Sequence, residues 1–295
     1  MVTLEEILLG VALPFGVAMV LLIGAALATR PWAAFLGDLA VAAGVVAGYL
    51  GLARLGQVSG IQWSPGAAEG WLPHIGGAAV VISIVVAVTG RRWIVWAAMP
   101  VLLTAVTWLT LRPIVANEWT GGEAVVWIGG VAFAASMIGL MSSEIERRVE
   151  GPVMPLVWLI VAGGASAGCV FGGSMKLAQL GGTLTAALAA MALVSMVRRG
   201  RMWSASAVGL PIVAALLINA HFYADLPGYA AIGVLLAPMA ALPVTFGPGT
   251  GWRRRRPVWA GAAVIAGAVV IVAGSLLPSA LRFIEDMREF DPYAY

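Results

Sequence analysis

Asp38 is the residue whose type and setting point most directly to chemistry in this sequence. It lies in an otherwise apolar run, roughly 10 Å beyond Pro31 at the helical rise of 1.5 Å per residue. A carboxylate inside a membrane helix costs about 2.5–3.5 kcal/mol on insertion scales, so such residues often bind ions or substrates. On a helical projection Asp38 shares a face with Ala42, Val45 and Tyr49. We expect it either to border a substrate path or to be a structural carboxylate, capped by an arginine or protonated.

Four other polar residues are candidates for the same path: Lys176, Asn219, His221 and Asp225. The segment 219–225 combines polar and aromatic side chains, and we expect it at the outer end of the molecule. Lys176 is expected near the outer end of a span, where its amine could capture an anion or simply reach water. An ordinary hydrated interface would explain the same four residues without any path.

Cofactor and enzyme motifs have little support. His74 and His221 are the two histidines and could together ligate one haem or metal ion, but neither has a second ligand at suitable spacing. Cys169 is the single cysteine and stands in an apolar run. The sequence has no phosphate-binding Gly-x-x-x-x-Gly-Lys, no His-Glu-x-x-His and no Gly-x-Ser-x-Gly. We therefore expect no metal and no cofactor, and an intramembrane enzyme or redox protein is the weakest hypothesis.

The elements that position these residues are predicted to be membrane-spanning helices. The 295 residues are 61% hydrophobic and 11% charged, whereas a soluble domain has roughly 25% charged residues. Apolar runs approach the ~20 residues needed to cross a bilayer. The runs are 7–29, 32–53, 71–89, 93–111, 122–142, 153–175, 178–197, 203–220, 229–247 and 258–278. We predict an all-α, polytopic bundle of about ten spans, with one transmembrane domain over 1–280 and a short amphipathic or acidic tail over 281–295.

The Lys and Arg residues predict the orientation of this bundle. One set of loops contains Arg30, Arg91, Arg92, Arg147, Arg148, Arg198, Arg199, Arg201 and Arg253 to Arg256. The alternate loops contain Arg54, Arg112, Lys176, Arg282 and Arg288. Because cytoplasmic loops carry the excess of basic residues, the pattern predicts an even number of spans with both termini outside. The same dispersal argues against nucleic acid as a partner.

The N-terminal segment does not resemble a secretory signal peptide. Residues 1–6 contain Glu5 and Glu6 but no Lys or Arg, whereas signal peptides begin with a basic region. We expect the first span to remain in the mature protein.

Glycines repeat at helical spacing in two of the expected spans. They are Gly37, Gly44, Gly48 and Gly51 in the second span, and Gly164, Gly168 and Gly172 in the sixth. Small residues let membrane helices approach closely, because van der Waals contact must replace the hydrophobic effect there. We expect both stripes to be packing faces, used within the chain or, alternatively, in a dimer or against a moving helix.

Prolines inside spans predict local kinks. Pro238 and Pro243 fall in the same span, and each removes a backbone donor from the helix. The ninth span is therefore the one most expected to be broken. Broken helices line binding sites in many transporters, but they also occur as fixed kinks.

Three hypotheses for function follow from these residues. The first is a small-solute transporter or channel in which Asp38, the broken span and the outer polar residues form the path. The second is a non-catalytic membrane subunit or scaffold that packs against a partner protein or another copy of itself. The third is the enzyme or redox protein. All three place the chain in a lipid bilayer, which we expect to be a bacterial inner membrane.

Overall fold

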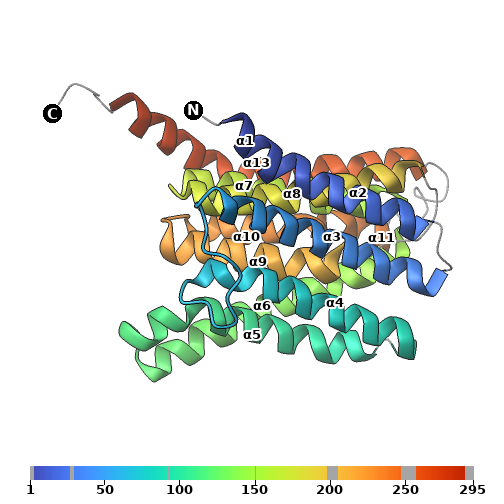
Figure 1. Ribbon diagram of the computed structural model, residues 1–295, viewed down its shortest axis with the longest axis horizontal. Helices are drawn as coiled ribbons and strands as arrows, with labels where there is room; N and C mark the ends of the chain where they lie inside the picture. The colour runs from blue at the N-terminus through green and yellow to red at the C-terminus, as the bar shows by residue number, and fades with distance from the viewer. Residues whose placement is uncertain are drawn as a thin grey trace.

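The structure, a computed structural model, describes residues 3–26, 30–91, 93–149, 151–197, 205–246 and 257–289. Throughout these residues the secondary structure is helical, with no strand. Within the described ranges, ten helical segments are long and apolar enough to cross a membrane. They lie side by side along one common direction (Figure 1). The predicted all-helical fold and the count of ten spans are confirmed, and the chain is a multi-pass membrane protein.

The first five spans alternate in direction through the bundle. The first combines α1 (Leu4–Ile7), the π-helical turn η1 (Leu8–Ala12) and α2 (Leu13–Ala26). The next four are α3 (Arg30–Arg54), the 3-10 turn η2 (Ala68–Trp71) with α4 (Leu72–Thr89), α5 (Trp93–Asn117) and α6 (Gly121–Arg148). Capping boxes begin α1 and α6, where Thr3 pairs with Glu6 and Thr120 with Glu123. These acidic residues thereby satisfy backbone donors that the first helical turn leaves free.

The last five spans include the interrupted helix. They are α7 (Val153–Phe171), α8 (Met175–Val197), α9 (Ser206–Tyr223), then α10 (Gly228–Leu236), the 3-10 turn η3 (Ala237–Ala241) and α11 (Leu242–Phe246), and finally α13 (Pro257–Glu289). The predicted break in the ninth span is confirmed at Pro238, which lies in the 3-10 turn. Proline removes the backbone donor that a continuous α-helix would need there.

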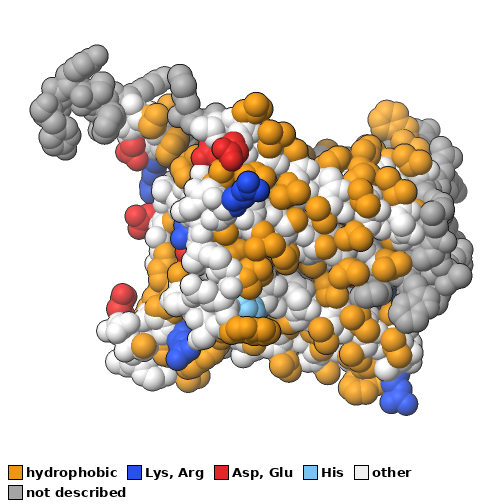
Figure 2. Space-filling model, viewed as in Figure 1, with side chains coloured by type: hydrophobic (Ala, Val, Ile, Leu, Met, Phe, Trp, Pro, Cys, Tyr) orange, Lys and Arg blue, Asp and Glu red, His pale blue; other side chains and the backbone are white. Residues whose placement is uncertain are grey.

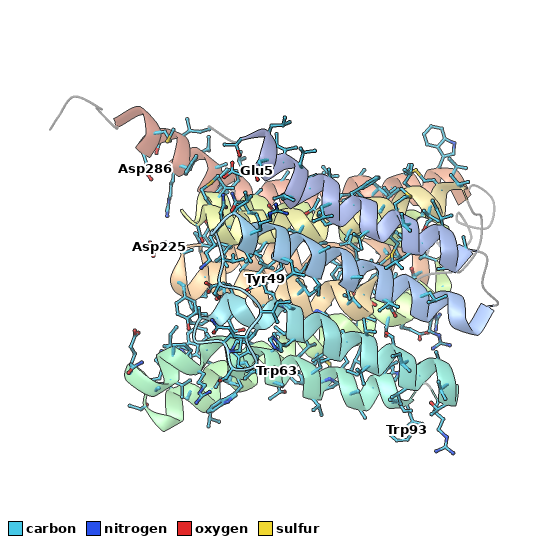
Figure 3. The ribbon with its side chains drawn as sticks, in the orientation of Figure 1. Glu5, Tyr49, Trp63, Trp93, Asp225 and Asp286 are labelled. Carbon is cyan, nitrogen blue, oxygen red and sulfur yellow. The ribbon has the colours of Figure 1, made fainter. Side chains whose placement is uncertain are left out.

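The beginning of α1 and the end of α13 lie at the same end of the bundle, as an even number of crossings requires (Figure 1). Glu5, Trp63, Asp225 and Asp286 lie at that end, and Trp93 lies at the other (Figure 3). We call the first the termini end and the second the opposite end. That the termini end faces outward remains a prediction. It depends largely on basic residues outside the described part of the chain: Arg92, Arg198, Arg199, Arg201 and Arg253 to Arg256.

Charge and burial agree with a bilayer around this bundle. Most charged side chains seen in Figure 2 lie toward the termini end, and the surface between the two ends is mostly hydrophobic or uncharged. The most deeply buried span is α9, which packs against α4, α5, α6, α7 and α8. Nearly every residue from Ser206 to Ala220 is buried. The first and last spans have more lipid-facing surface.

Two helix boundaries can be compared with the predicted spans and tail. We expected Lys176 at the end of the sixth span, but α7 stops at Phe171 and Lys176 is the second residue of α8. The reversal occurs through Gly172 and Gly173, and Gly173 has the left-handed φ of 86° that favours glycine. At the C-terminus, residues 281–289 continue α13 without a break. Residues 290–295 of the expected tail lie outside the described residues.

Candidate functional site

Asp38 is buried between α3 and α4, with 4% of its surface exposed. Ser83 of α4 donates a hydrogen bond from its Oγ to Asp38 Oδ2 at 2.6 Å. The other carboxylate oxygen, Oδ1, is buried and has no hydrogen-bond partner among the described residues. A buried polar atom left without a partner costs about 1–3 kcal/mol, and more when it is charged. This oxygen is therefore a place where a ligand, an ion or water would be stabilised.

The face of α3 that carries Asp38 is buried along its length. Asp38, Ala42, Val45 and Tyr49, which we call the Asp38 seam, are each at most 4% exposed. A Cβ built on Gly76 of α4 would lie 3.8 Å from both the Ala42 Cβ and the Ile212 Cδ1 of α9. The seam therefore faces the junction of α3, α4 and α9, which is the interior of the bundle.

Unpartnered polar atoms stand at both ends of this seam. The Tyr49 hydroxyl is fully buried and, like Asp38 Oδ1, has no partner among the described residues. The two residues are eleven positions apart, which is roughly 16 Å along a helix. Nδ1 of His74 on α4 is also buried without a described partner, and its ring lies 5.5 Å from that of Trp71. Because buried polar groups are normally hydrogen-bonded, these three atoms mark positions suited to water or a polar ligand.

Glu146 forms a second carboxylate centre near the opposite end. Its Oε1 accepts hydrogen bonds from Trp158 Nε1 at 3.0 Å and from the Ser206 backbone N–H at 2.9 Å. Its Oε2 accepts one from Ser206 Oγ at 2.7 Å. Trp158 is the largest fully buried side chain among the described residues. Glu146 thus joins α6, α7 and α9.

Sequence reasoning missed Glu146, Trp158 and Ser83. A signal for Glu146 was present, because it follows Gly139 and Ser142 on one helical face, and both of these are buried. Glu144, two residues earlier, points elsewhere and pairs with Arg147 and Arg148. Ser83 had no signal, because a serine in an apolar helix is common and its partner is remote in sequence.

Lys176 forms an ion pair with Glu69 of η2 at the termini end. The lysine side chain remains 42% exposed and the glutamate 15%. The pair links the start of α8 to the loop before α4. The amine is thus partly neutralised, which leaves it less available to an anion than an unpaired lysine would be.

The other three candidate path residues lie near the end of α9. Asn219 is buried and donates from Nδ2 to the Ala215 carbonyl of its own helix at 2.9 Å. The Nδ1 of His221 lies 2.7 Å from the Leu226 carbonyl. Asp225 is exposed and has a left-handed φ of 50°. These residues and Lys176 are at the termini end, whereas Asp38 lies toward the opposite end, so the five do not converge on one site.

The two glycine stripes contact helices of the same chain. A Cβ on Gly44 would meet the Pro14 carbonyl oxygen at 2.8 Å and the Ala187 Cβ at 2.9 Å. Gly48 and Gly51 face Thr183 and Leu9 in the same way, and Gly37 is buried on the same helix. In the sixth span Gly164 faces Val272, Gly168 faces Leu276, and Gly172 faces the Ala224 carbonyl. These contacts place α2 and α8 against α3, and α13 and the 224–226 loop against α7.

A metal centre has no support among the described residues, which contain no group of three or more His, Cys, Asp or Glu side chains able to hold an ion. The arrangement at Asp38 instead offers two buried carboxylate oxygens, one of which accepts a hydrogen bond from the Ser83 hydroxyl. Comparison of the chain with family models, with curated proteins and with solved structures found no match.

Proposed function

We propose that the protein is a transporter or channel for a small solute and that the Asp38 seam forms part of its path. The observation that carries this proposal is Asp38 itself, buried at 4% exposure with Oδ1 unpartnered among the described residues. Carboxylates inside membrane proteins commonly mark substrate and ion pathways. The buried Tyr49 hydroxyl and His74 Nδ1, which also have no partner among the described residues, would continue this path toward the termini end.

The chemistry of the seam favours a positively charged species. A buried carboxylate is costly unless its charge is neutralised. The hydrogen-bond partner of Asp38 among the described residues is the neutral Ser83 hydroxyl, which supplies no positive charge. A small cation, or the ammonium group of a solute, would supply the missing positive charge at Oδ1.

The experiment uses small thiol reagents as probes, because the solute is unknown. In a Cys169→Ala background, Val45→Cys places a thiol in the middle of the seam. Its reaction with a cationic and with an anionic methanethiosulfonate of similar size is measured by mass spectrometry. We expect the cationic reagent to modify Val45→Cys roughly tenfold faster than the anionic one, a ratio equivalent to about 1.4 kcal/mol. Adding Asp38→Asn should reduce this preference.

The matched control is Leu188→Cys in α8, which is also fully buried but lies outside the seam. It should react slowly with both reagents. The proposal fails if Val45→Cys is as unreactive as Leu188→Cys, or if Asp38→Asn leaves the charge preference unchanged.

A scaffold is the second candidate function, and one feature of α6 favours it. Gly122, Gly129 and Gly130 are exposed, and a Cβ on any of them would meet nothing within 4 Å. Such an open glycine face has room for a helix of a partner or of a second copy. A scaffold of this kind needs no hydrated seam, so the same thiol measurements distinguish it from a transporter.

A further inference from the structure

A groove on the outside of the bundle, away from the Asp38 seam, has the shape and chemistry of a lipid site. It has a volume of about 410 Å³ and lies between α5, α6 and α11. The residues that line it are Trp96, Met137, Leu140, Met141, Glu144, Leu242 and Phe246. This volume is within the range of small-molecule sites, which is about 300–1,000 Å³.

The walls of the groove suit a hydrocarbon chain. Apart from Glu144, all of its lining side chains are apolar. Met137 and Met141 are about two-fifths exposed, and Trp96 and Phe246 about half exposed, so the groove opens toward lipid. From Met137 to Glu144 the groove follows α6 for roughly 10 Å. Methionine side chains are flexible and polarisable, so they adapt to chains of differing shape.

The end of the groove near Glu144 has a cluster of two arginines. Arg147 Nη1 and Arg148 Nε bond to the two Glu144 oxygens at 2.7 and 2.9 Å. The Arg148 guanidinium also lies 4.2 Å from the centroid of the Phe246 ring, which forms a groove wall. Two guanidinium groups thus lie at this end of the groove, beside the one carboxylate, Glu144, that lines it. Both arginine side chains are about half exposed.

We propose that this groove binds a phospholipid with an anionic headgroup. One acyl chain lies along Met137 and Met141, and the phosphate is held by Arg147 and Arg148. Guanidinium groups match the geometry of phosphate oxygens. Trp96 stands near the same end, at the headgroup level that indole rings favour. The break at η3 helps to form the site, because α11 after it supplies Leu242 and Phe246.

The test uses purified full-length protein and native mass spectrometry with phosphatidylglycerol and phosphatidylcholine of identical acyl chains. The wild type should retain one phosphatidylglycerol in preference to phosphatidylcholine. Met141→Trp fills the groove and should abolish retention of both lipids. Arg148→Gln should keep the chain site but lower the phosphatidylglycerol preference about fivefold.

Two control variants have matched chemistry outside the groove. Val126→Trp adds the same ring to another lipid-facing position of α6, and Arg112→Gln removes a charge at the termini end. Neither should change lipid retention. Equal retention of the two lipids by wild type, or unchanged retention in Met141→Trp, would overturn the proposal. So would a wild-type dimer that Met141→Trp dissociates, because a second copy would then occupy the groove.

Discussion

Asp38 and Glu146 are two carboxylates in opposite hydrogen-bonding situations. Glu146 has both oxygens engaged by Trp158 and Ser206. Asp38 has one oxygen on Ser83 and the other unpartnered among the described residues. A carboxylate whose two oxygens both accept hydrogen bonds from neighbouring helices stabilises their packing, whereas a carboxylate with one oxygen unpartnered can bind and release a ligand. We therefore assign structure to Glu146 and, as part of the proposed function, ligand binding to Asp38.

Glu146→Ala should lower the stability of the protein. The substitution leaves the Trp158 Nε1–H and the Ser206 backbone N–H without the acceptor that each has now, and each loss costs about 1–3 kcal/mol. Unfolding can be followed with a fluorogenic maleimide, because Cys169 is the single cysteine of the sequence and is buried. We expect a clearly lower melting temperature than that of wild type.

Glu144→Ala on the same helix is the control for this variant. Glu144 pairs with Arg147 and Arg148 at helical spacing near the surface, and such pairs contribute roughly 0.3–0.5 kcal/mol each. Its melting temperature should stay close to that of wild type. Equal effects of the two substitutions would show that Glu146 is not a structural centre.

The sequence alone could identify Asp38 as a candidate, because the free-energy cost of placing a carboxylate in an apolar membrane helix is a property of that one residue. The sequence could not show whether this carboxylate binds a ligand or is structural. That distinction depends on its hydrogen-bond partner Ser83, which is remote in the chain. The Glu69–Lys176 pair was hidden for the same reason. Partners brought together by tertiary packing leave no local pattern.

At the scale of elements, neighbouring helices can approach α3 closely because the glycines on its packing face have no side chain. A Cβ on Gly48 would lie 2.5 Å from Thr183 Cγ2 of α8, and one on Gly51 would lie 2.7 Å from the Leu9 carbonyl oxygen. These distances are too short for any real Cβ, so a larger residue must separate the helices. The spacing of the glycines could be read from the sequence, but the sequence did not show which helices pack against them.

Gly48→Leu should therefore destabilise the bundle by roughly 1–3 kcal/mol, the usual cost of overpacking a core. Melting temperature in detergent is the measurement. Gly24→Leu on α2 is the matched control, because a Cβ there would meet nothing within 4 Å. A Gly48→Leu variant as stable as Gly24→Leu would contradict this account of α3 packing.

The effect of a proline on its helix is only partly predictable from the sequence. Pro238 predicted the interruption of the ninth span because proline changes the backbone at its own position. Pro278 lies inside α13, yet that helix continues to Glu289. A proline kinks or breaks a helix according to the packing around it, which sequence alone does not contain.

At the scale of the whole molecule, ten spans were predictable because span length is set by bilayer thickness. The apolar runs match the observed helices closely, although α5, α6 and α13 extend several residues beyond the predicted runs. The beginning of α1 and the end of α13 lie at one end of the bundle, which agrees with the even count (Figure 1). Which end faces outward stays a prediction from the basic loops.

The most direct test of the proposed path is whether Val45 can be reached from both sides of a membrane. Val45→Cys in the Cys169→Ala background is treated with a membrane-impermeant thiol reagent in right-side-out and in inside-out vesicles. Trp63→Cys is the control, because Trp63 is 96% exposed at the termini end and should react from one side only. A transporter or channel predicts labelling of Val45→Cys from both sides. Labelling from one side alone, or from neither, would contradict a path through the Asp38 seam.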